Sequence, residues 1–340
     1  MLSLFRVRHF YSRLPHHPFR RFTFARTGTV VLLAVVLVTP VPASADRYPP
    51  RVQVFVANSG SDSVTVYDTR FGRVVATIPV GDSPVGVGAV PGRDLVYVTN
   101  EQAGTVSVID ARAHKVVATV PVGRNPFGVA ATPKFAYVTN FGSDSVTVVD
   151  VATNKPVASV PVGRFPHTPV VSPDASRVYV TNNGGQSVTV IDTKSNKPVA
   201  TIPVGRFPAG VDVSDDGTRV YVANTGSDTV TIIDTAQDKP IGTAAVGPAP
   251  IGVAVTPRGR VHVPNALADT VSVLTPSGAP AGPAVPVGRQ PEGAAASPDD
   301  SFVFVTNAKA DTMSVIDAVT GKIVDTVTVG KEPEGLTVTS

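Results

Sequence analysis

The feature that most constrains the fold of this chain is a repeat with a period of about forty residues. Seven times, a short run of β-favouring residues ends in asparagine, and successive asparagines are 40 to 42 residues apart. These residues are Asn58, Asn100, Asn140, Asn182, Asn224, Asn265 and Asn307. A period of this length with several short strands per unit is typical of a β-propeller, in which each unit forms one blade of a ring.

One unit shows how many strands a blade contains. Around Asn224, the segments 208–214, 219–224, 229–234 and 241–246 are rich in β-branched residues and are separated by turns that contain Asp, Gly or Asn. Alternation of this kind predicts four antiparallel strands, which we name A, B, C and D from the hub to the rim. We therefore predict an all-β fold over residues 52–340, a seven-bladed β-propeller of four-stranded antiparallel blades.

The positions of proline and of small residues indicate which strand lies where. Strand D ends in Pro-Val-Gly in five of the seven units, and proline is confined to sheet edges because it cannot donate to the ladder. Strand A contains small residues, as expected around a narrow hub. The first segment, 52–58, is of type B and the last, 335–339, is of type A. We therefore expect the C-terminal strand to join the N-terminal blade and close the ring.

Residues 1–45 are predicted to be a signal peptide. Six arginines and no acid precede or flank the apolar run 29–38, and Ala43-Ser44-Ala45 offers a cleavage site. The run is much shorter than the roughly 20 apolar residues that span a bilayer, which argues against a permanent membrane span. We expect residues 46–51 to be a short linker and the mature protein to be secreted, periplasmic or at the cell surface. Retention of the segment as an anchor is the alternative.

The composition of the mature chain excludes several classes of function. Removal of the six N-terminal arginines lowers the formal net charge from +3 to −3, so the bulk charge does not favour a nucleic-acid partner. The chain has no cysteine, which excludes disulfides, thiolate metal sites and covalent haem attachment. The mature length suits one large domain, and we expect a monomer.

Three motifs recur in phase and resemble a known family. Tyr-Val-Thr-Asn occurs at 97–100, 137–140 and 179–182, together with Ser-Val-x-Val-Ile-Asp and Pro-Val-Gly. They resemble the YVTN family of β-propeller repeats over residues 52–340, although Phe55 and Phe304 replace the tyrosine, His262 stands in the sixth unit, and Thr275 replaces the aspartate of strand C. The resemblance implies an exported or surface-associated propeller, many of which have no known role. It also implies distant kinship with lactonases, streptogramin lyases and domains of periplasmic redox enzymes, which does not define a reaction.

Most of the repeated polar residues are predicted to be structural. The asparagines that end strand B, and the aspartates that end strand C in six units, have short side chains that can cap their own loops. His262 replaces a tyrosine and is expected to pack as a satisfied core residue. A functional site is expected to break the symmetry of the repeat.

One set of candidate site residues is cationic. Just after the glycine that ends strand D stand Arg124, Arg164, Arg206, Arg289 and Lys331. The D-to-A and B-to-C loops emerge on one face of a propeller, so these cations could bind an anionic small molecule or polymer, or an extracellular protein. The alternative is that they form solvated ion pairs with the loop acids Asp62, Asp144, Asp228, Asp269 and Asp311.

A second set consists of polar residues at hub positions that are apolar in most of the other units. The residue after the loop proline is His167, Glu292 or Glu334 in three units, and Asp212 is the only acid at its repeat position in strand A. Together these four could bind a hydrated Mg²⁺ or Ca²⁺, or act as an acid–base pair. The alternative is that they lie too far apart to act together. No other cofactor is predicted.

We therefore predict a ligand-binding, protein-binding or scaffold module outside the cytoplasm. A metal-assisted lyase or lactonase-like enzyme, with its site at the channel mouth, is the alternative. Scarce tyrosine and absent tryptophan argue against a stacking surface for single-stranded nucleic acid.

Overall fold

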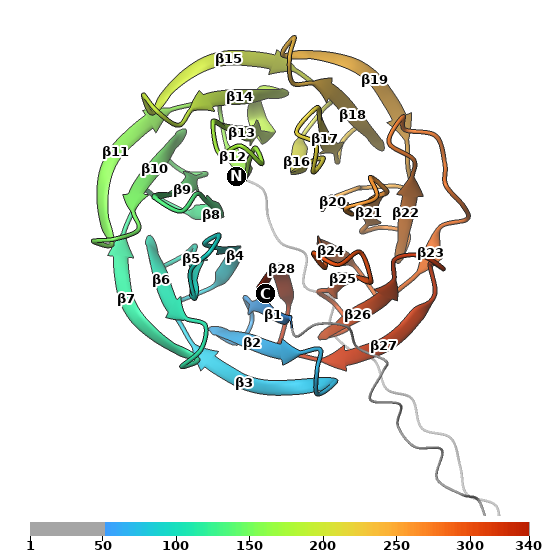
Figure 1. The fold of residues 1–340 in the computed structure, drawn as a ribbon, viewed down its shortest axis with the longest axis horizontal. Coiled ribbons are helices and arrows are strands. Elements are labelled where there is room, and N and C mark those ends of the chain that lie inside the picture. The colour runs from blue at the N-terminus through green and yellow to red at the C-terminus, as the bar shows by residue number, and fades with distance from the viewer. Residues whose placement is uncertain (1–51, 340) are drawn as a thin grey trace, which may run out of the picture. The chain divides into compact units, whose positions relative to one another are not determined.

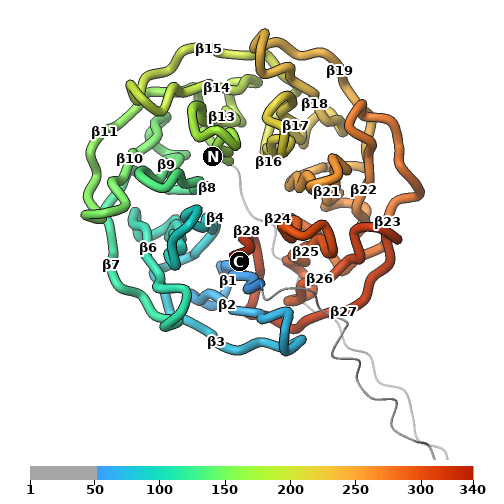
Figure 2. The backbone as a smooth tube through the Cα atoms, viewed as in Figure 1, coloured from blue at the N-terminus to red at the C-terminus, as the bar shows by residue number. Residues whose placement is uncertain are grey.

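The computed structural model describes residues 52–339, which form a seven-bladed β-propeller (Figure 1). Every blade is a four-stranded antiparallel sheet, and the path of the backbone winds through seven such sheets around one axis (Figure 2). The predicted fold class is confirmed. The expected signal peptide, 1–45, and linker, 46–51, lie outside the described residues. Between residues 52 and 339 no helix is long and apolar enough to cross a membrane.

The strands follow one another from the hub to the rim within each blade. The first blade contains β28 (Pro333–Thr339), β1 (Gln53–Asn58), β2 (Ser63–Asp68) and β3 (Arg73–Pro79). The second contains β4 (Pro84–Ala89), β5 (Leu95–Asn100), β6 (Thr105–Asp110) and β7 (Lys115–Pro121). The third contains β8 (Pro126–Ala131), β9 (Phe135–Asn140), β10 (Ser145–Asp150) and β11 (Lys155–Pro161). The fourth contains β12 (Pro166–Val171), β13 (Arg177–Asn182), β14 (Ser187–Asp192) and β15 (Lys197–Pro203), with the short 3₁₀ turn η2 (Asn183–Gly185) after β13.

The remaining three blades follow the same order, although the sixth is less regular. The fifth contains β16 (Pro208–Val213), β17 (Arg219–Asn224), β18 (Thr229–Asp234) and β19 (Lys239–Ala245). The sixth contains β20 (Ala254–Val255), β21 (Val261–Asn265), β22 (Thr270–Leu274) and β23 (Val285–Pro286). The seventh contains β24 (Pro291–Ala296), β25 (Phe302–Asn307), β26 (Thr312–Asp317) and β27 (Ile323–Thr328). The sixth blade has two-residue strands at both its inner and its outer edge.

The ring is closed by the C-terminal strand, as the sequence predicts. Strand β28 pairs antiparallel with β1, with Gln53 opposite Thr339 and Val56 opposite Leu336. The first blade is therefore built from both ends of the described chain. Because blades in such arrays contact mainly their neighbours, this pairing joins the two ends of the array.

A buried asparagine links strand B of a blade to the loop that enters the same blade. In the second blade, the Asn100 side-chain oxygen accepts a hydrogen bond from Gly81 N at 3.2 Å, while its Nδ2 donates to Thr105 Oγ1 and Ser107 Oγ at 3.0 Å each. A Cβ on Gly81 would lie 2.7 Å from Asn100 Cγ, so only glycine fits there. We call this arrangement the asparagine clamp.

The asparagine clamp, with its glycine N–H bond, is present in five blades and corrects one detail of the sequence analysis. The five bonds join Asn58 to Gly330, Asn100 to Gly81, Asn140 to Gly123, Asn182 to Gly163 and Asn224 to Gly205. The structural role predicted for these asparagines is confirmed. The asparagine oxygen, however, binds the preceding D-to-A loop instead of capping its own loop, because the glycine amide comes close enough to reach it.

The other polar residues of Tyr-Val-Thr-Asn bind the following blade. Tyr97 Oη donates to Asn154 Oδ1 at 2.7 Å, and Thr99 Oγ1 donates to the Phe127 carbonyl oxygen at 2.6 Å. Both acceptors belong to the third blade. The tetrapeptide therefore recurs because its tyrosine and threonine bind forward to the next blade while its asparagine secures the entry loop.

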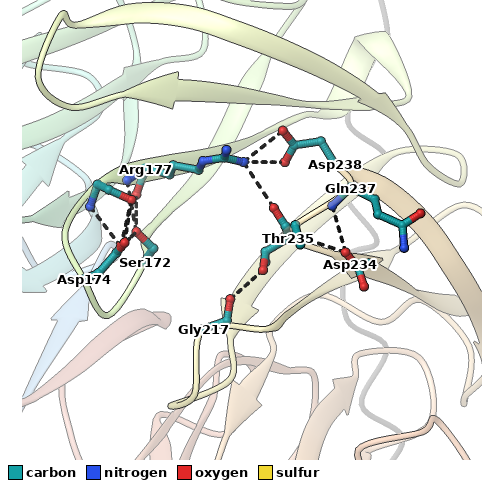
Figure 3. A network of polar contacts seen from close by, with 10 residues as sticks. Ser172, Asp174, Arg177, Gly217, Asp234, Thr235, Gln237 and Asp238 are labelled. Carbon is teal, nitrogen blue, oxygen red and sulfur yellow. Dashed lines mark hydrogen bonds and ion pairs between the residues drawn. The ribbon is translucent and has the colours of Figure 1, made fainter.

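On the opposite face of the ring, caps order the turns, and two ion pairs among residues 52–339 join neighbouring blades: Arg177 with Asp238 and Arg258 with Asp300. Figure 3 shows Arg177 reaching across to the next blade, where its Nη1 donates to the Thr235 carbonyl at 3.2 Å and to the two Asp238 carboxylate oxygens at 2.8 and 2.9 Å. Asp234 accepts a hydrogen bond from Gln237 N at 2.8 Å. This bond confirms the predicted turn-capping role of the strand C aspartates.

His262 differs from the expectation of a satisfied core residue. The side chain is buried as expected, with 1% of its surface exposed, but neither ring nitrogen has a hydrogen-bond partner within residues 52–339. Burial lowers the pKa of His262 to about 4, so the ring is neutral at pH 7. The shorter imidazole does not reproduce the forward hydrogen bond that tyrosine makes from the equivalent position.

The asparagine clamp gives a first prediction. We expect Asn58→Ala to lower the free energy of unfolding by about 2–4 kcal/mol, because it leaves the Gly330 amide and the hydroxyls of Ser63 and Thr65 without their partner. Asn307→Ala is the matched control. Its oxygen has no partner within residues 52–339, so we expect a smaller loss. Denaturant titration of both variants measures the difference, and equal losses would contradict the proposed importance of the glycine bond.

Candidate functional site

The strands nearest the axis approach one another so closely that they require glycine. In six of the seven blades, strand A begins Pro-x-Gly. A Cβ on Gly293 would lie 2.4 Å from the Glu334 carbonyl oxygen, and one on Gly335 would lie 2.5 Å from that of Val85. The residue between this proline and glycine, written x, is thus held in place, because its carbonyl group packs against the glycine of the preceding blade. We call the seven x residues the hub ring: Val85, Phe127, His167, Ala209, Ile251, Glu292 and Glu334.

The innermost strands enclose a central cavity of about 560 Å³. Its lining comes from strand A of all seven blades and includes the four polar candidates His167, Asp212, Glu292 and Glu334. The structure therefore places all of them in one cavity. It brings only Glu292 and Glu334 into direct contact within the described part of the chain.

Glu292 and Glu334 form a carboxyl pair between the seventh and first blades. Their side chains lie close enough for each carboxyl group to shift the pKa of the other. Gln290 Nε2 donates to Glu292 Oε1 at 2.6 Å, and Ser59 Oγ donates to Glu334 Oε1 at 3.2 Å. Burial, followed by repulsion from Glu292, raises the pKa of Glu334 to about 8. The pair therefore retains a proton at neutral pH, and such a pair can both donate and accept one.

Asp212 is paired with main-chain amides across a blade boundary. Its Oδ2 accepts a hydrogen bond from Val255 N at 2.7 Å, and its Oδ1 accepts one from Val213 N at 2.8 Å. Val255 belongs to β20, the two-residue inner strand of the sixth blade. Burial raises the pKa of Asp212 to about 7, although the two amides oppose this shift. The acid at the hub thus supports the irregular sixth blade.

His167 stacks against an aromatic ring instead of facing a carboxylate. The centroids of the His167 and Phe127 rings are 3.9 Å apart, and His167 Nδ1 lies 3.0 Å from Thr168 Oγ1. Burial lowers the pKa of His167 to about 4, so the imidazole is neutral at pH 7. Within residues 52–339 no hydrogen bond or ion pair joins His167 to Asp212, and no three His, Asp or Glu residues gather as metal ligands would. A divalent-cation site formed by these four candidates stays a prediction.

The candidate cations Arg124, Arg164, Arg206, Arg289 and Lys331 lie exposed on the loops that enter strand A. None of the five forms an ion pair within the described residues 52–339. Arg289 Nη2 donates to the Lys309 carbonyl at 2.8 Å. Pairing of these cations with the loop acids, which was the expected alternative, is not found among the described residues.

The loop acids are occupied by main-chain amides. Asp144 Oδ1 accepts a hydrogen bond from Phe165 N at 2.8 Å, 21 residues further along the chain. Asp62, Asp228, Asp269 and Asp311 do the same for Ser83, Ala249, Gln290 and Glu332. Each acid thus fixes the D-to-A loop that follows it in the chain. The guanidinium groups of this face are left available to a ligand.

Sequence reasoning missed an aromatic cluster on the same face. Phe165 and Phe207 are 38% and 56% exposed. The Phe165 ring stacks on Phe141 with centroids 5.0 Å apart and an interplanar angle of 13°, and Phe141 lies 6.1 Å from Phe127. The signal was present as the tripeptide Arg-Phe-Pro, which occurs at 164–166 and at 206–208.

Comparison with known proteins identifies the family and the fold. The family model of YNCE-like β-propellers matches residues 130–260 and 254–339. No curated protein sequence matches the chain. A Kuenenia stuttgartiensis hydrazine synthase structure is similar with a TM-score of 0.72 and 23% identity, over 78% of this chain and 92% of that one.

Two further solved structures share the architecture. A functionally unknown protein from Desulfotomaculum acetoxidans has a TM-score of 0.73 and 17% identity, covering 84% of this chain and 98% of that one. A candidate 6-phosphogluconolactonase from Bacteroides fragilis has a TM-score of 0.74 and 15% identity, covering 88% of this chain and 100% of that one. At these identities the likeness concerns the fold alone.

The carboxyl pair gives a prediction about pH. The folded state holds the Glu334 proton up to about pH 8, whereas the unfolded chain loses it near pH 4.5. The pair therefore lowers the free energy of unfolding by an amount that grows as the pH rises between these two values. Glu334→Gln keeps the shape and the donor without the charge. We expect it to stabilise the fold by about 2 kcal/mol at pH 8 and by little at pH 5.

The Tm of Glu334→Gln relative to the unmodified protein, measured at both pH values, checks this expectation. Glu332→Gln, at an exposed glutamate two residues earlier, is the control. It removes an exposed ion pair with Lys309 and should give a small difference that changes little between pH 5 and pH 8. A constant Tm difference for Glu334→Gln across this range would show that the carboxyl pair carries no raised pKa.

Proposed function

Because the chain belongs to the YNCE-like β-propeller family, we propose that it is a binding or scaffold module that holds an anionic ligand or a protein partner on one face of a rigid ring. This face carries the D-to-A and B-to-C loops. We propose further that the module acts as a monomer outside the cytoplasm. The arginine-rich leader followed by an apolar run and a small-residue cleavage site supports export.

One observation carries the proposal. On the loops that enter strand A, the acids are bound to main-chain amides while the neighbouring guanidinium groups are exposed and form no ion pair within residues 52–339. A guanidinium group can donate two parallel hydrogen bonds to a carboxylate or phosphate. The loops of this face therefore keep their arginines separate from their acids, although Lys309 pairs with Glu332 there.

The rigidity of the loops supports a binding role. An asparagine clamp fixes the start of the entry loop in five blades, and an aspartate from the preceding unit fixes the entry loop in five blades, three of which also have the clamp. A surface that is already ordered loses little conformational entropy when it binds. Affinity can then come from a modest number of contacts.

An enzyme is the second candidate, and the carboxyl pair is the observation that favours it. A proton shared between Glu292 and Glu334 at the wall of a cavity suits general acid–base catalysis, as in a lyase or a lactonase-like reaction. No group of three potential metal ligands is present among residues 52–339, so the metal-assisted form of this hypothesis has no support from these residues.

A turnover assay tests the enzyme. If Glu334 transfers the proton, we expect Glu334→Gln to reduce the hydrolysis of simple lactones at least about a hundredfold, with little change in KM, because a positioned acid or base contributes about 10²–10⁴ in rate. Glu332→Gln is the control. Failure of the unmodified protein to turn over any lactone or cyclic ester at neutral pH would dismiss this candidate.

Charge reversal tests the binding module. We expect Glu substitution of Arg124, Arg164, Arg206 and Arg289 together to weaken binding of polyglutamate and of a polyuronate at least about tenfold, because the attraction becomes repulsion. Fluorescence titration at low and moderate salt measures the effect. The control reverses Lys115, Lys155, Lys197 and Lys239, four exposed lysines at the start of strand D. Equal weakening in the control would show that only net charge matters.

A further inference from the structure

We propose that Phe165 and Phe207, together with the arginines that precede them, form the centre of a docking surface for an acidic polypeptide segment with apolar side chains. We call this surface the Arg-Phe surface: Arg124, Phe141, Arg164, Phe165, Arg206 and Phe207. The inference rests on the proposed function, since it names the partner of the same face. It adds a class of partner and a location, the entry loops of the fourth and fifth blades.

The repeat itself marks these two phenylalanines as exceptions. The position before the loop proline is occupied in the other five units by residues that are small or polar: Ser83, Asn125, Ala249, Gln290 and Glu332. Only Phe165 and Phe207 are large and apolar there. They belong to adjacent blades, so the exception is local to one sector of the ring.

The backbone conformation makes phenylalanine a poor choice for the fold. Phe165 and Phe207 have φ values of 52° and 50°, in the left-handed region that bulky residues rarely adopt. The other five units share this conformation at the equivalent position, with φ between 47° and 54°. Asn125 of the third blade is the residue type among them that tolerates it best. Strain that persists at a position with an easier alternative points to a use other than folding.

Each phenylalanine ring rests on a glycine of the neighbouring B-to-C loop. A Cβ on Gly184 would lie 2.4 Å from Phe165 Cδ2, and one on Gly226 would lie 2.4 Å from Phe207 Cδ2. Both rings nevertheless stay substantially exposed. The equivalent glycines Gly60 and Gly142 lie against Glu332 and Asn125, so the glycine is shared with other blades and the apolar rings are the exception. At the surface these rings add little to the core.

An aromatic run extends from Phe165 toward the hub. Phe165 stacks on Phe141, Phe141 lies beside Phe127, and Phe127 contacts His167 of the hub ring. The stacked contact with Phe141 orders the Phe165 ring before any partner arrives, and tilted ring contacts continue from Phe141 to Phe127 and His167. A pre-ordered apolar anchor of this kind is what a binding surface requires at its centre.

The charges around the rings select an acidic partner. The Arg164 guanidinium carbon lies 5.2 Å from the centroid of the Phe165 ring, and Arg124, Arg164 and Arg206 have no ion-pair partner within residues 52–339. Aromatic residues and arginine are enriched at the energetic centres of protein interfaces. Carboxylates would meet the guanidinium groups while apolar side chains contact the exposed ring edges.

A single-stranded nucleic acid is the competing partner, and the geometry disfavours it. Base stacking needs free ring faces, but the Phe165 ring already stacks on Phe141 and has the Arg164 guanidinium over it. The formal charge of −3 on the chain after residue 45 opposes a polyphosphate and an acidic peptide alike, so it does not separate the two partners. A peptide, however, can contact the exposed ring edges and does not need free ring faces.

Three labelled probes test the inference by fluorescence anisotropy: a 15-residue peptide that alternates glutamate and leucine, polyglutamate, and a 15-nucleotide oligothymidylate. We expect the double substitution Phe165→Asn with Phe207→Asn to weaken binding of the glutamate–leucine peptide at least tenfold. The affinity for polyglutamate should change by no more than about twofold. The control, Val157→Ala with Val199→Ala, removes two similarly exposed apolar residues from the rim and should change neither.

The possible outcomes separate this inference from the proposed function. If charge reversal of the arginines weakens binding of both acidic probes while the phenylalanine substitutions weaken binding of neither, the proposal of the Arg-Phe surface is wrong. The proposal of an anion-binding face then stands. If the reversal weakens neither, the proposed function fails. If oligothymidylate binds more tightly than the peptide and depends on the two phenylalanines, the partner is a nucleic acid and the inference is overturned.

Stability gives a second, independent readout. Because asparagine accepts the left-handed conformation, we expect Phe207→Asn alone to raise the Tm by about 2–4 °C. The same substitution should weaken binding of the glutamate–leucine peptide. A lower Tm for this variant would mean that Phe207 serves the fold, and the proposal would lose its argument from strain.

Discussion

The asparagine clamp is the interaction on which the rest of this structure depends. A buried amide that lacks partners costs free energy, so each asparagine must be satisfied by groups brought to it from elsewhere. In five blades these groups are the hydroxyls of strand C and the glycine amide of the entry loop. The clamp thereby determines where every such loop begins. At Asn58 and Gly330 it also ties together two residues from opposite ends of the described chain.

Close packing at the hub has a similar consequence for the inner wall. Where a glycine of one blade touches the carbonyl of the next, residue x of the hub ring has no freedom in its main chain. Threonine hydroxyls of strand B hold several of the same carbonyls, as Thr139 does for His167. The polar side chains of the cavity are therefore placed by constraints common to all blades, and only their chemistry varies from blade to blade.

Two regions of one face depart from the repeat in different ways. At the cavity wall, Glu292 and Glu334 form a pair that retains a proton, while Asp212 supports a shortened inner strand. On the entry loops, arginines are kept apart from acids, and phenylalanines occupy strained, exposed positions. The face opposite these loops contains the turn caps and the Arg177–Asp238 pair, which hold blades together. Because the departures from the repeat lie on the face with the entry loops, we expect a partner to bind there.

The sequence by itself determined the number of blades, the order of strands within them, the closure by residues near the C-terminus and the membership of the polar set at the hub. These follow from periodicity, because a repeated pattern of β-branched residues, turns and edge prolines has one compatible architecture. The family resemblance named on Tyr-Val-Thr-Asn is confirmed by the match to YNCE-like β-propellers. What the tertiary structure decided concerns contacts between residues distant in sequence. It showed that the loop acids bind amides and not arginines, that Glu292 meets Glu334 while His167 does not meet Asp212, and that Phe165 stacks on Phe141. Periodicity gives the position of a residue within its blade, but which groups meet across a blade boundary depends on side-chain reach and packing, and these exist only in the folded ring.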